Sequence, residues 1–583
     1  MKWRILILSA ISLFFTACQV QENIQDGQTA YKLKKYKLAA ELLQKDFNKA
    51  ELPDEKSKIA FQIGESYANN NNYENAGEWY FKAYDLGYES EAILQYALML
   101  KAQEKYEEAL KEFEKYLLEE PYRRPEMTLE MDACKNGIAW KQRQENEYER
   151  DTYVTEITTL NSGDADFNPV IYQGDKLIFT SSRDMSTGEN NDSWTGDKYY
   201  DLYVANIKDV TSFSAPELFK GPFNAAYNDG TLAFNKDYSE VYFTRCGSDD
   251  RKVDDYCGIY VSNYLPDGGW SEPVALPFFD DTMNIGTPCL SLDGNTLFFA
   301  ATNPDGYGGA DIYMSRRTES GWDAAYNAGQ VINTSGNEVF PYFDSEGVMY
   351  FSSDKHPGLG GLDIFSATWK NNKFSNIKNM EYPINSGADD FGLILLDKKQ
   401  FINSDTLNAG YFSSNRKGGM GDDDMYFFAK TTKKLRPPVF VLKGTVLEKV
   451  YLDSLDVNST VLDTIPLDKS IATLSYPNEQ TLLGKWNIGD EGIFSIQVDS
   501  LKEYKITGMK EGYFNNTTYV TTKTVKGKPG DTVVVYASVV LDKIPIAIGE
   551  KAGEIKLKNI YYDYNDSSLR AESFPELDKL VKL

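Results

Sequence analysis

A recurring pair of short apolar strands most strongly constrains the fold of this 583-residue chain. The first strands of the pairs are LIFTSSR (177–183), VYFTR (241–245), LFFAAT (297–302), MYFSSD (349–354) and GYFSSNR (410–416). The second strands begin at Asp201, Gly258, Asp311, Asp363 and Asp424, which are 57, 53, 52 and 61 residues apart. This period, with Gly-rich turn signals between strands, is typical of four-stranded blades enlarged by loops. The sequence therefore predicts an all-β propeller of about five blades over residues 151–432, and a sixth blade is not visible.

Residues 25–148 carry a second repeat, with the apolar spacing of helices. Tyr36, Tyr73 and Tyr106 are 37 and 33 residues apart, and an alanine follows three residues after each. Small residues let two helices approach, while large aromatic residues fill the space to the next repeat. The pattern resembles the tetratricopeptide family, which implies an α-helical solenoid whose concave face binds a protein partner. The alternative is that the array only spaces the body of the protein away from a membrane.

The strand repeat itself resembles the TolB-like, WD40-like propeller repeat through FNP at 167–169 and LSLDGNTLFFA at 290–300. A third segment, 438–545, follows two prolines and contains alternating strands at 440–449, 490–498, 503–514 and 531–541. These strands predict a small β-sandwich. The segment resembles the carboxypeptidase regulatory-like domain, a family without catalytic residues of its own.

The last segment, 552–583, resembles the first strand and first helix of an α+β OmpA-like domain. In that family the peptidoglycan-binding Asp and Arg lie in later segments, so the resemblance places no peptidoglycan-binding residue in this chain. We expect the sequence to be cut short of its natural end, with a genuine truncation as the alternative. An isolated strand and helix cannot bury both faces and should be poorly ordered.

The N-terminus has the features of a secretion signal. Lys2 and Arg4 precede an apolar stretch, 5–15, that is too short to span a bilayer, so residues 1–17 are predicted to be a signal peptide. Cys18 follows small residues and resembles the cysteine of a bacterial lipobox, which implies lipidation of Cys18 and a lipidated tether over 18–24. The alternative is ordinary secretion. A single acid among the residues after Cys18 favours the periplasmic face of an outer membrane, with the cell surface as the alternative.

Four further cysteines fall into two groups. Cys246 and Cys257 are close together in RCGSDDRKVDDYCG, and a non-cytosolic location permits a disulfide between them. Cys134 and Cys289 are predicted to be buried apolar residues rather than a pair.

Chemistry-bearing motifs are absent from the sequence. It contains no G-x-S-x-G, H-E-x-x-H or Walker loop, and its one histidine, His356, is predicted to be a loop residue. The Asp residues that recur at strand starts are predicted to cap turns. The acidic loops 184–201 and 415–426 could bind Ca²⁺, but they lack the EF-hand spacing and are predicted to be solvated turns. We therefore predict no catalytic, cofactor-binding or metal-binding residue and no enzyme activity.

The net charge of −26 disfavours nucleic acid as a partner. The order of segments resembles that of the multidomain OmpA-family lipoproteins of Bacteroidota. This resemblance implies a lipid-anchored periplasmic scaffold that ties protein partners of the type IX secretion or gliding machinery to peptidoglycan, through a C-terminal segment beyond this chain. The alternative is a propeller that binds or cleaves a glycan or peptide with carboxylates, as some propeller glycosidases do.

Overall fold

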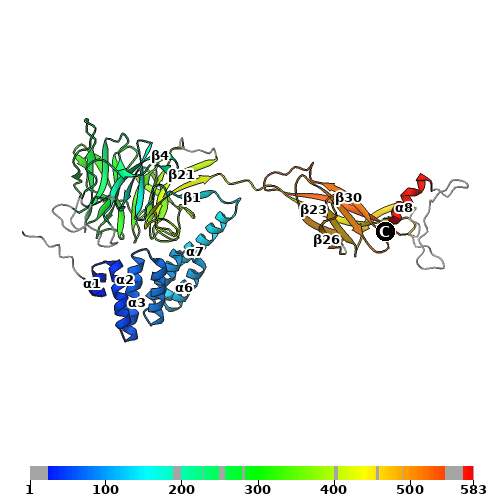
Figure 1. Cartoon of the computed structure of the whole chain (residues 1–583), viewed down its shortest axis with the longest axis horizontal. Coiled ribbons are helices and arrows are strands. Elements are labelled where there is room, and N and C mark those ends of the chain that lie inside the picture. The colour runs from blue at the N-terminus through cyan, green and yellow to red at the C-terminus, as the bar shows by residue number, and fades with distance from the viewer. Residues whose placement is uncertain are drawn as a thin grey trace, which may run out of the picture. The chain divides into compact units, whose positions relative to one another are not determined.

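The computed structural model describes residues 24–184, 186–187, 198–225, 227–247, 256–278, 283–398, 405–454, 459–489, 491–544 and 569–581. The chain divides into two compact units, Met1–Lys433 and Lys434–Leu583 (Figure 1). The predicted signal peptide 1–17, Cys18 and nearly all of the tether 18–24 lie outside the described residues. The same holds for the predicted OmpA-like strand, because 552–568 are not described.

The first unit begins with an array of helices whose consecutive members pack side by side (Figure 1). They are α1 (Gly27–Lys32), α2 (Tyr36–Lys49), α3 (Pro53–Ala68), α4 (Tyr73–Asp85), α5 (Glu91–Ala102), α6 (Tyr106–Glu119) and α7 (Arg124–Glu145), with the short η1 (Pro121–Arg123) before α7. A Cβ on Gly64 of α3 would lie 2.8 Å from the ring of Tyr80 on α4, and a Cβ on Gly27 of α1 would lie 2.7 Å from Leu43 N on α2. Glycine therefore allows the close packing that buries Tyr80 and Leu43.

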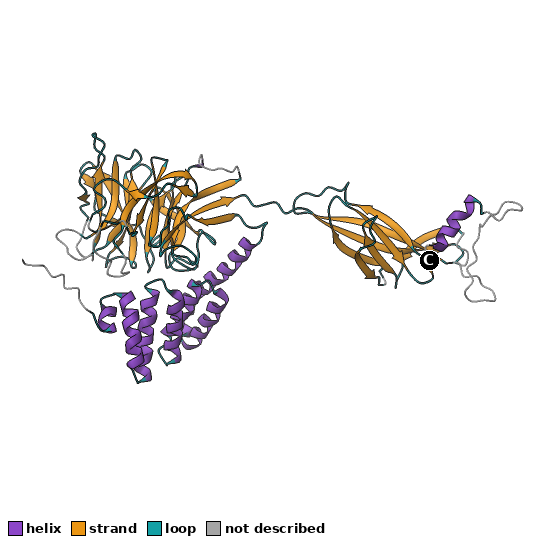
Figure 2. Ribbon diagram, in the orientation of Figure 1, coloured by secondary structure: helices purple, strands orange, loops and turns teal. Residues whose placement is uncertain are grey.

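Five antiparallel sheets follow the helices (Figure 2), as the strand period predicts. Blade one contains β2 (Asp166–Tyr172), β3 (Lys176–Ser181), β4 (Asp201–Asp209), β5 (Ser212–Phe213) and β6 (Glu217–Leu218). Blade two contains β7 (Asn228–Phe234), β8 (Glu240–Cys246), β9 (Cys257–Asn263) and β10 (Val274–Ala275). Blade three contains β11 (Ile285–Leu290), β12 (Thr296–Thr302), β13 (Ala310–Thr318), β14 (Gly321–Trp322) and β15 (Tyr326–Asn327). Blade four contains β16 (Glu338–Phe343), β17 (Val348–Ser353), β18 (Asp363–Lys370) and β19 (Lys373–Asn379), and blade five contains β20 (Asp390–Leu395), β21 (Thr406–Ser414), β22 (Asp424–Thr431) and β1 (Thr152–Glu156).

The blades close into a ring because the strand that precedes blade one completes blade five. β1 pairs antiparallel with β22, with Thr152 opposite Lys430 and Glu156 opposite Tyr426. The innermost strands β2, β7, β11, β16 and β20 contact one another in this order, and β20 returns to β2. Hydrophobic clusters fill the spaces between neighbouring blades, so each blade is stabilised by the next. This closure positions the five innermost strands around one axis.

The helical array packs against loops of blades four and five. Leu359 of blade four is fully buried in the same cluster as residues of α5 and α6. The Gly387 backbone N–H donates to Glu104 Oε1 at 3.2 Å, and Arg143 Nη2 of α7 lies 2.5 Å from Glu381 Oε2. The array and the propeller therefore belong to one unit.

The second unit consists of two sheets that share one hydrophobic core. The first sheet contains β23 (Val439–Tyr451), β24 (Val461–Pro466), β27 (Ile493–Val498), β29 (Tyr513–Phe514) and β31 (Thr532–Lys543). The second contains β25 (Ile471–Ser475), β26 (Leu482–Asn487), β28 (Glu503–Met509) and β30 (Asn516–Thr521), and η3 (Ala571–Ser573) and α8 (Phe574–Val581) follow near the end of the chain. β23 and β31 pair in parallel, an arrangement that joins the two ends of this segment.

Candidate functional site

The innermost strand of each blade contains one residue with a left-handed backbone. These residues are Asn168 (φ 53°), Thr231 (φ 33°), Thr287 (φ 49°), Phe340 (φ 54°) and Gly392 (φ 61°). The pairing register of each innermost strand shifts beside this residue, so all five strands carry a bulge at the same level. A left-handed conformation is rare for a β-branched residue such as threonine, so the surrounding structure must enforce it.

Hydroxyl groups of the neighbouring blade hold three of these strained residues in place. The N–H of Thr231 donates to Thr180 Oγ1 of blade one at 3.0 Å, and the N–H of Thr287 donates to Thr244 Oγ1 of blade two at 3.0 Å. In the same way, the N–H of Asn168 donates to Oγ of Ser413 in blade five at 2.9 Å. The hydroxyls come from the second strand of each blade, which explains why FTS, FTR and FSS recur there.

These innermost strands surround an axial channel of about 270 Å³. Its polar side chains are those of Asn168, Thr231 and Thr287, together with Tyr342 and the thiol of Cys289, and the rest of the lining is proline, glycine and apolar side chains. Among the described residues, no carboxylate and no cationic side chain lines the channel. The channel can therefore accept an uncharged group and offer it hydroxyl and amide hydrogen bonds.

A second hollow, of about 260 Å³, adjoins the channel at Thr231 and Thr287, which line both. Its walls come from blades one to three and include Phe167 and Tyr200, whose rings meet edge to face at 5.2 Å. Its described lining is almost entirely apolar at the surface and carries no charged side chain. No residue of the helical array lines it.

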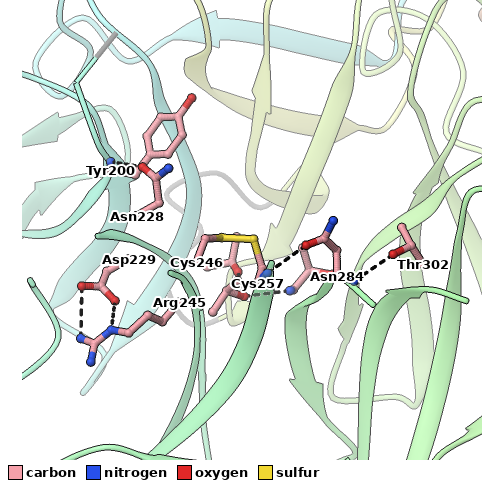
Figure 3. Close-up of a disulfide and its surroundings, with 11 residues drawn as sticks. Tyr200, Asn228, Asp229, Arg245, Cys246, Cys257, Asn284 and Thr302 are labelled. Carbon is pink, nitrogen blue, oxygen red and sulfur yellow. Dashed lines mark hydrogen bonds and ion pairs between the residues drawn. A yellow bond between two sulfur atoms is a disulfide. The ribbon is translucent and has the colours of Figure 1, made fainter. Parts of the chain in front are cut away.

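The disulfide that the sequence predicts forms one wall of this hollow (Figure 3). Cys246 ends β8 and Cys257 begins β9, directly opposite in the pairing register. The N–H of Cys257 donates to Asn284 Oδ1 at 2.8 Å, and the N–H of Asn284 donates to Thr302 Oγ1 at 2.9 Å. The disulfide thus ties β8 to β9 within blade two, and the hydrogen bond from Cys257 to Asn284 ties blade two to blade three beside the hollow.

Buried carboxylates fix the loops before the innermost strands rather than facing the hollows. Asp166, Asp229 and Asp390 are fully buried, stand two residues before the left-handed residue, and pair with an arginine of their own blade. Asp229 also accepts the N–H of Ala225 at 2.7 Å, and Arg245 lies against it (Figure 3). Burial raises the pKa of Asp229 to about 7, which the Arg245 guanidinium only partly opposes.

The Asp residues at the starts of third strands cap turns, as the sequence predicts. Asp201 accepts the N–H of Thr187, Asp311 accepts that of Tyr307, Asp363 accepts that of Gly360, and Asp424 accepts that of Gly421. None of these four carboxylates lines the channel or the hollow. A carboxylate mechanism in these two recesses therefore finds no support among the described residues.

Of the other residues singled out by the sequence, His356 and Cys134 line neither recess, whereas Cys289 lines the channel. His356 Nε2 is 2.8 Å from the carbonyl oxygen of Ile332, so its ring is held in a loop. Cys134 and Cys289 are buried free thiols, and burial raises the pKa of both to about 12, so neither is a thiolate near neutral pH. Cys18 lies outside the described residues.

The two acidic loops are described only in part. Residues 185 and 188–197 of the 184–201 loop are not described, whereas 415–426 is described throughout. In the described part of the chain, no cluster of three or more metal-ligating side chains is found. No described helix is long and apolar enough to cross a membrane.

Sequence reasoning missed the two threonines at which the channel and the hollow meet. A usable signal exists, because Asn-x-Gly-Thr occurs at 228–231 and again at 284–287. The glycine before each threonine leaves room for the neighbouring blade: a Cβ on Gly230 would lie 3.1 Å from Thr180 Cγ2, and one on Gly286 would lie 3.1 Å from Thr244 Cγ2. The repeated Asn-x-Gly-Thr tetrapeptide therefore indicates a position where two blades approach closely.

Comparison with known proteins identifies the propeller architecture and no family. No family model and no curated protein matches the chain. Among solved structures, a luciferin-regenerating enzyme matches with 10% identity and a TM-score of 0.29. The match covers 48% of this chain and 98% of the enzyme's chain. An α-L-arabinofuranosidase from Clostridium thermocellum matches with 11% identity, 52% and 94% coverage and a TM-score of 0.28. A β-1,2-mannobiose phosphorylase from Listeria innocua matches with 10% identity, 48% and 96% coverage and a TM-score of 0.31.

These matches correct the prediction of no enzyme activity. Several of the matched structures are enzymes by their titles, at low identity. The prediction was wrong because it relied on missing contiguous motifs. A propeller assembles a site from blades that are far apart in the sequence, so a missing motif excludes no reaction in this fold. The similarity concerns the architecture alone and transfers none of these reactions to the chain.

Proposed function

We propose that the propeller binds an extended, uncharged ligand, a glycan or a peptide, in the hollow of blades one to three and in the axial channel. One observation carries this proposal: the two recesses adjoin at Thr231 and Thr287, whose backbones are held in the left-handed region. Such a conformation costs about 1–3 kcal/mol per residue and is concentrated at functional sites. The enforced strain therefore marks this position as the place where a ligand is bound.

The chemistry of the lining selects the ligand class. A charged ligand would lose its hydration here without meeting an opposite charge, which is unfavourable by several kcal/mol. An uncharged chain can instead pack its apolar faces on Phe167 and Tyr200, while the amide of Asn168 faces its polar groups and the Thr287 hydroxyl, which accepts the N–H of Phe340, can still donate. Sugar rings and peptide segments with small side chains both meet this description.

Filling the hollow tests the proposal. Ala310 lines the hollow, whereas Ala275 is exposed on the outermost strand β10, so Ala310→Phe and Ala275→Phe form a matched pair. Binding of neutral oligosaccharides and neutral peptides to the full chain is measured by calorimetry, with mass spectrometry of the mixture to detect cleavage. We expect Ala310→Phe to abolish binding and Ala275→Phe to leave it unchanged. Equal affinity of both variants for every ligand that binds would refute the proposal.

A scaffold role is the second candidate, and the joint between the helices and the propeller favours it. Arg143 and Glu104 connect α7 and the end of α5 to blades four and five, so a partner on the helices would be held at a set place relative to the propeller. We propose that the helices are tetratricopeptide repeats that bind a protein of the secretion or gliding machinery. Affinity capture with Arg143→Ala and the unaltered chain tests this, because a partner that needs both domains should be lost with the joint.

We also propose a periplasmic, lipid-anchored location, with Cys18 as the modified residue and peptidoglycan as a partner of the OmpA-like domain that 552–583 is predicted to begin. Metabolic labelling with a fatty-acid analogue should mark the unaltered chain and not Cys18→Ser. Retention on purified sacculi by the gene's full reading frame tests the contact with peptidoglycan. Absence of label on the unaltered chain would contradict the anchor.

A further inference from the structure

A third recess, the largest of the three described, lies between blades two and three. It has a volume of about 390 Å³ and is called the aromatic cleft here, after its lining residues Phe278, Phe299, Tyr313 and Trp322. Phe278 stacks on Phe299 with ring centroids 4.9 Å apart and planes 3° apart, and Phe299 stacks in turn on Tyr313 at 6.4 Å. Phe299 and Tyr313 are buried, so the half-buried rings of Phe278 and Trp322 are the aromatic surfaces that a ligand in the cleft can reach.

Trp322 is held rigidly in the cleft by its neighbours. The guanidinium carbon of Arg317 lies 4.6 Å from the Trp322 ring centroid, and Arg317 is neutralised by Glu240 at 2.6 Å. The ring of Trp322 meets that of Tyr242 edge to face at 5.8 Å.

Two polar side chains complete the lining, and one of them, Asp323, favours a ligand that donates hydrogen bonds. Asp323 is exposed and makes no ion pair or side-chain hydrogen bond that involves the described residues, while Asn303 Oδ1 accepts the N–H of Asp305 at 3.0 Å. Among the described residues, no cationic side chain lines the cleft. A free carboxylate in a chain of net charge −26 disfavours anionic ligands.

We propose that the aromatic cleft is a subsite for a neutral oligosaccharide, with sugar rings stacked on the aromatic side chains and sugar hydroxyls donating to Asp323. A proline-rich peptide is the competing ligand, because such peptides also bind aromatic grooves. Its carbonyl groups need hydrogen-bond donors, however, whereas the exposed carboxylate of Asp323 only accepts. This inference rests on the proposed function and names its ligand class.

Calorimetry of the full chain with neutral β-1,4-linked glucose and N-acetylglucosamine oligomers of increasing length tests the subsite. Asp323→Asn keeps the shape and removes the charge, and Asp267→Asn, on an exposed turn outside the cleft, is the matched control. A hydrogen bond to a charged group contributes about 1.5–3 kcal/mol, so Asp323→Asn should weaken binding at least about tenfold. Affinity should rise with oligomer length, and Asp267→Asn should bind as the unaltered chain does.

The outcomes separate this inference from the proposed function. Oligosaccharide binding that Ala310→Phe abolishes but Asp323→Asn leaves intact overturns the subsite and keeps the hollow. Binding of proline-rich peptides in place of sugars overturns the saccharide class in the same way. Binding that depends on Asp323 and is indifferent to Ala310→Phe supports the cleft and overturns the hollow as the main site. Absence of binding by every oligosaccharide overturns the inference, while neutral peptides still test the hollow.

Discussion

Breaking the buried ion pair between Lys101 and Glu130 should destabilise the helical array strongly. Lys101 Nζ lies 2.6 Å from Glu130 Oε2, and the exposed fractions of the two side chains are 6% and 21%. A buried charge that loses its partner keeps its desolvation cost, so Glu130→Met should lower the free energy of unfolding by about 3–5 kcal/mol. Lys101→Met should cost about 3 kcal/mol, at the lower end of that range, because some water reaches Glu130.

The double variant is the decisive comparison. Two methionines need no partner, so Lys101→Met with Glu130→Met should recover most of the lost stability. Urea unfolding of the full chain, followed by circular dichroism at the helix band, measures the effect on the helices. With a slope of about 2 kcal/mol per M, each single variant should lower the midpoint by about 1.5–2.5 M. Two single losses that add in the double variant, or that are each below about 1 kcal/mol, would show that no coupled buried pair exists.

The pair also predicts a pH window. Burial alone would raise the pKa of Glu130 and lower that of Lys101, but their mutual attraction prevails and lowers the pKa of Glu130 and raises that of Lys101. The contribution of Glu130 to the free energy of unfolding is fully present at a pH above 4.5, the ordinary pKa of its carboxyl group. It is lost as the pH falls through the lowered pKa of Glu130 in the folded protein. The contribution of Lys101 to the free energy of unfolding is fully present at a pH below 10.5, the ordinary pKa of its amino group. It is lost as the pH rises through the raised pKa of Lys101 in the folded protein.

Three further perturbations test other parts of the first unit. Replacing Cys246 and Cys257 by serine should lower stability by about 2–3 kcal/mol in thermal or denaturant unfolding, because the closed loop is short; an unchanged midpoint would contradict this. Gly387→Val should loosen the joint with the helices, because a Cβ there would lie 2.3 Å from the Ala102 carbonyl oxygen. Hydrogen exchange in the α5–α6 loop should therefore be faster in this variant. It should be unchanged in the control Gly163→Val, because nothing lies within 4 Å of a Cβ at Gly163. Burial raises the pKa of Asp363 from 3.8 to about 7, so the folded state binds this proton more tightly than the unfolded state does. The free energy of unfolding should therefore decline from about pH 4 to 7, and Asp363→Asn should make this decline less steep. An identical decline in the variant would contradict the raised pKa of Asp363.

The strands with continuous apolar runs were predictable from local sequence. LIFTSSR and DLYVA became β3 and β4, and corresponding pairs appear in every blade, because buried second and third strands need apolar residues in continuous runs. In the helical array, the tyrosine and alanine spacing indicated a helical repeat, and Tyr36, Tyr73 and Tyr106 begin α2, α4 and α6. Local pattern sufficed in both cases because the spacing of the residues is uninterrupted along each strand and each helix.

The innermost strands were missed for a physical reason. β7 reads NDGTLAF, and its alternation is broken at Gly230 and Thr231, where the register shifts and the backbone turns left-handed. The same interruption occurs in all five innermost strands. A bulge moves side chains to the other face, so a pattern with period two cannot reveal these strands. In the second unit, β24 and β26 were missed because they carry mostly exposed side chains.

The sequence by itself determined that a helical repeat precedes a repeat of strands, the number of blades and the disulfide, because each depends on residues that are close in the chain or recur at a fixed period. Only the tertiary structure decided where the recesses lie. Thr231 and Thr287 belong to different blades, and each owes its backbone conformation to a hydroxyl from the preceding blade. Ring closure brings such residues together around the axis, and no local pattern encodes which uncharged surfaces then face one another.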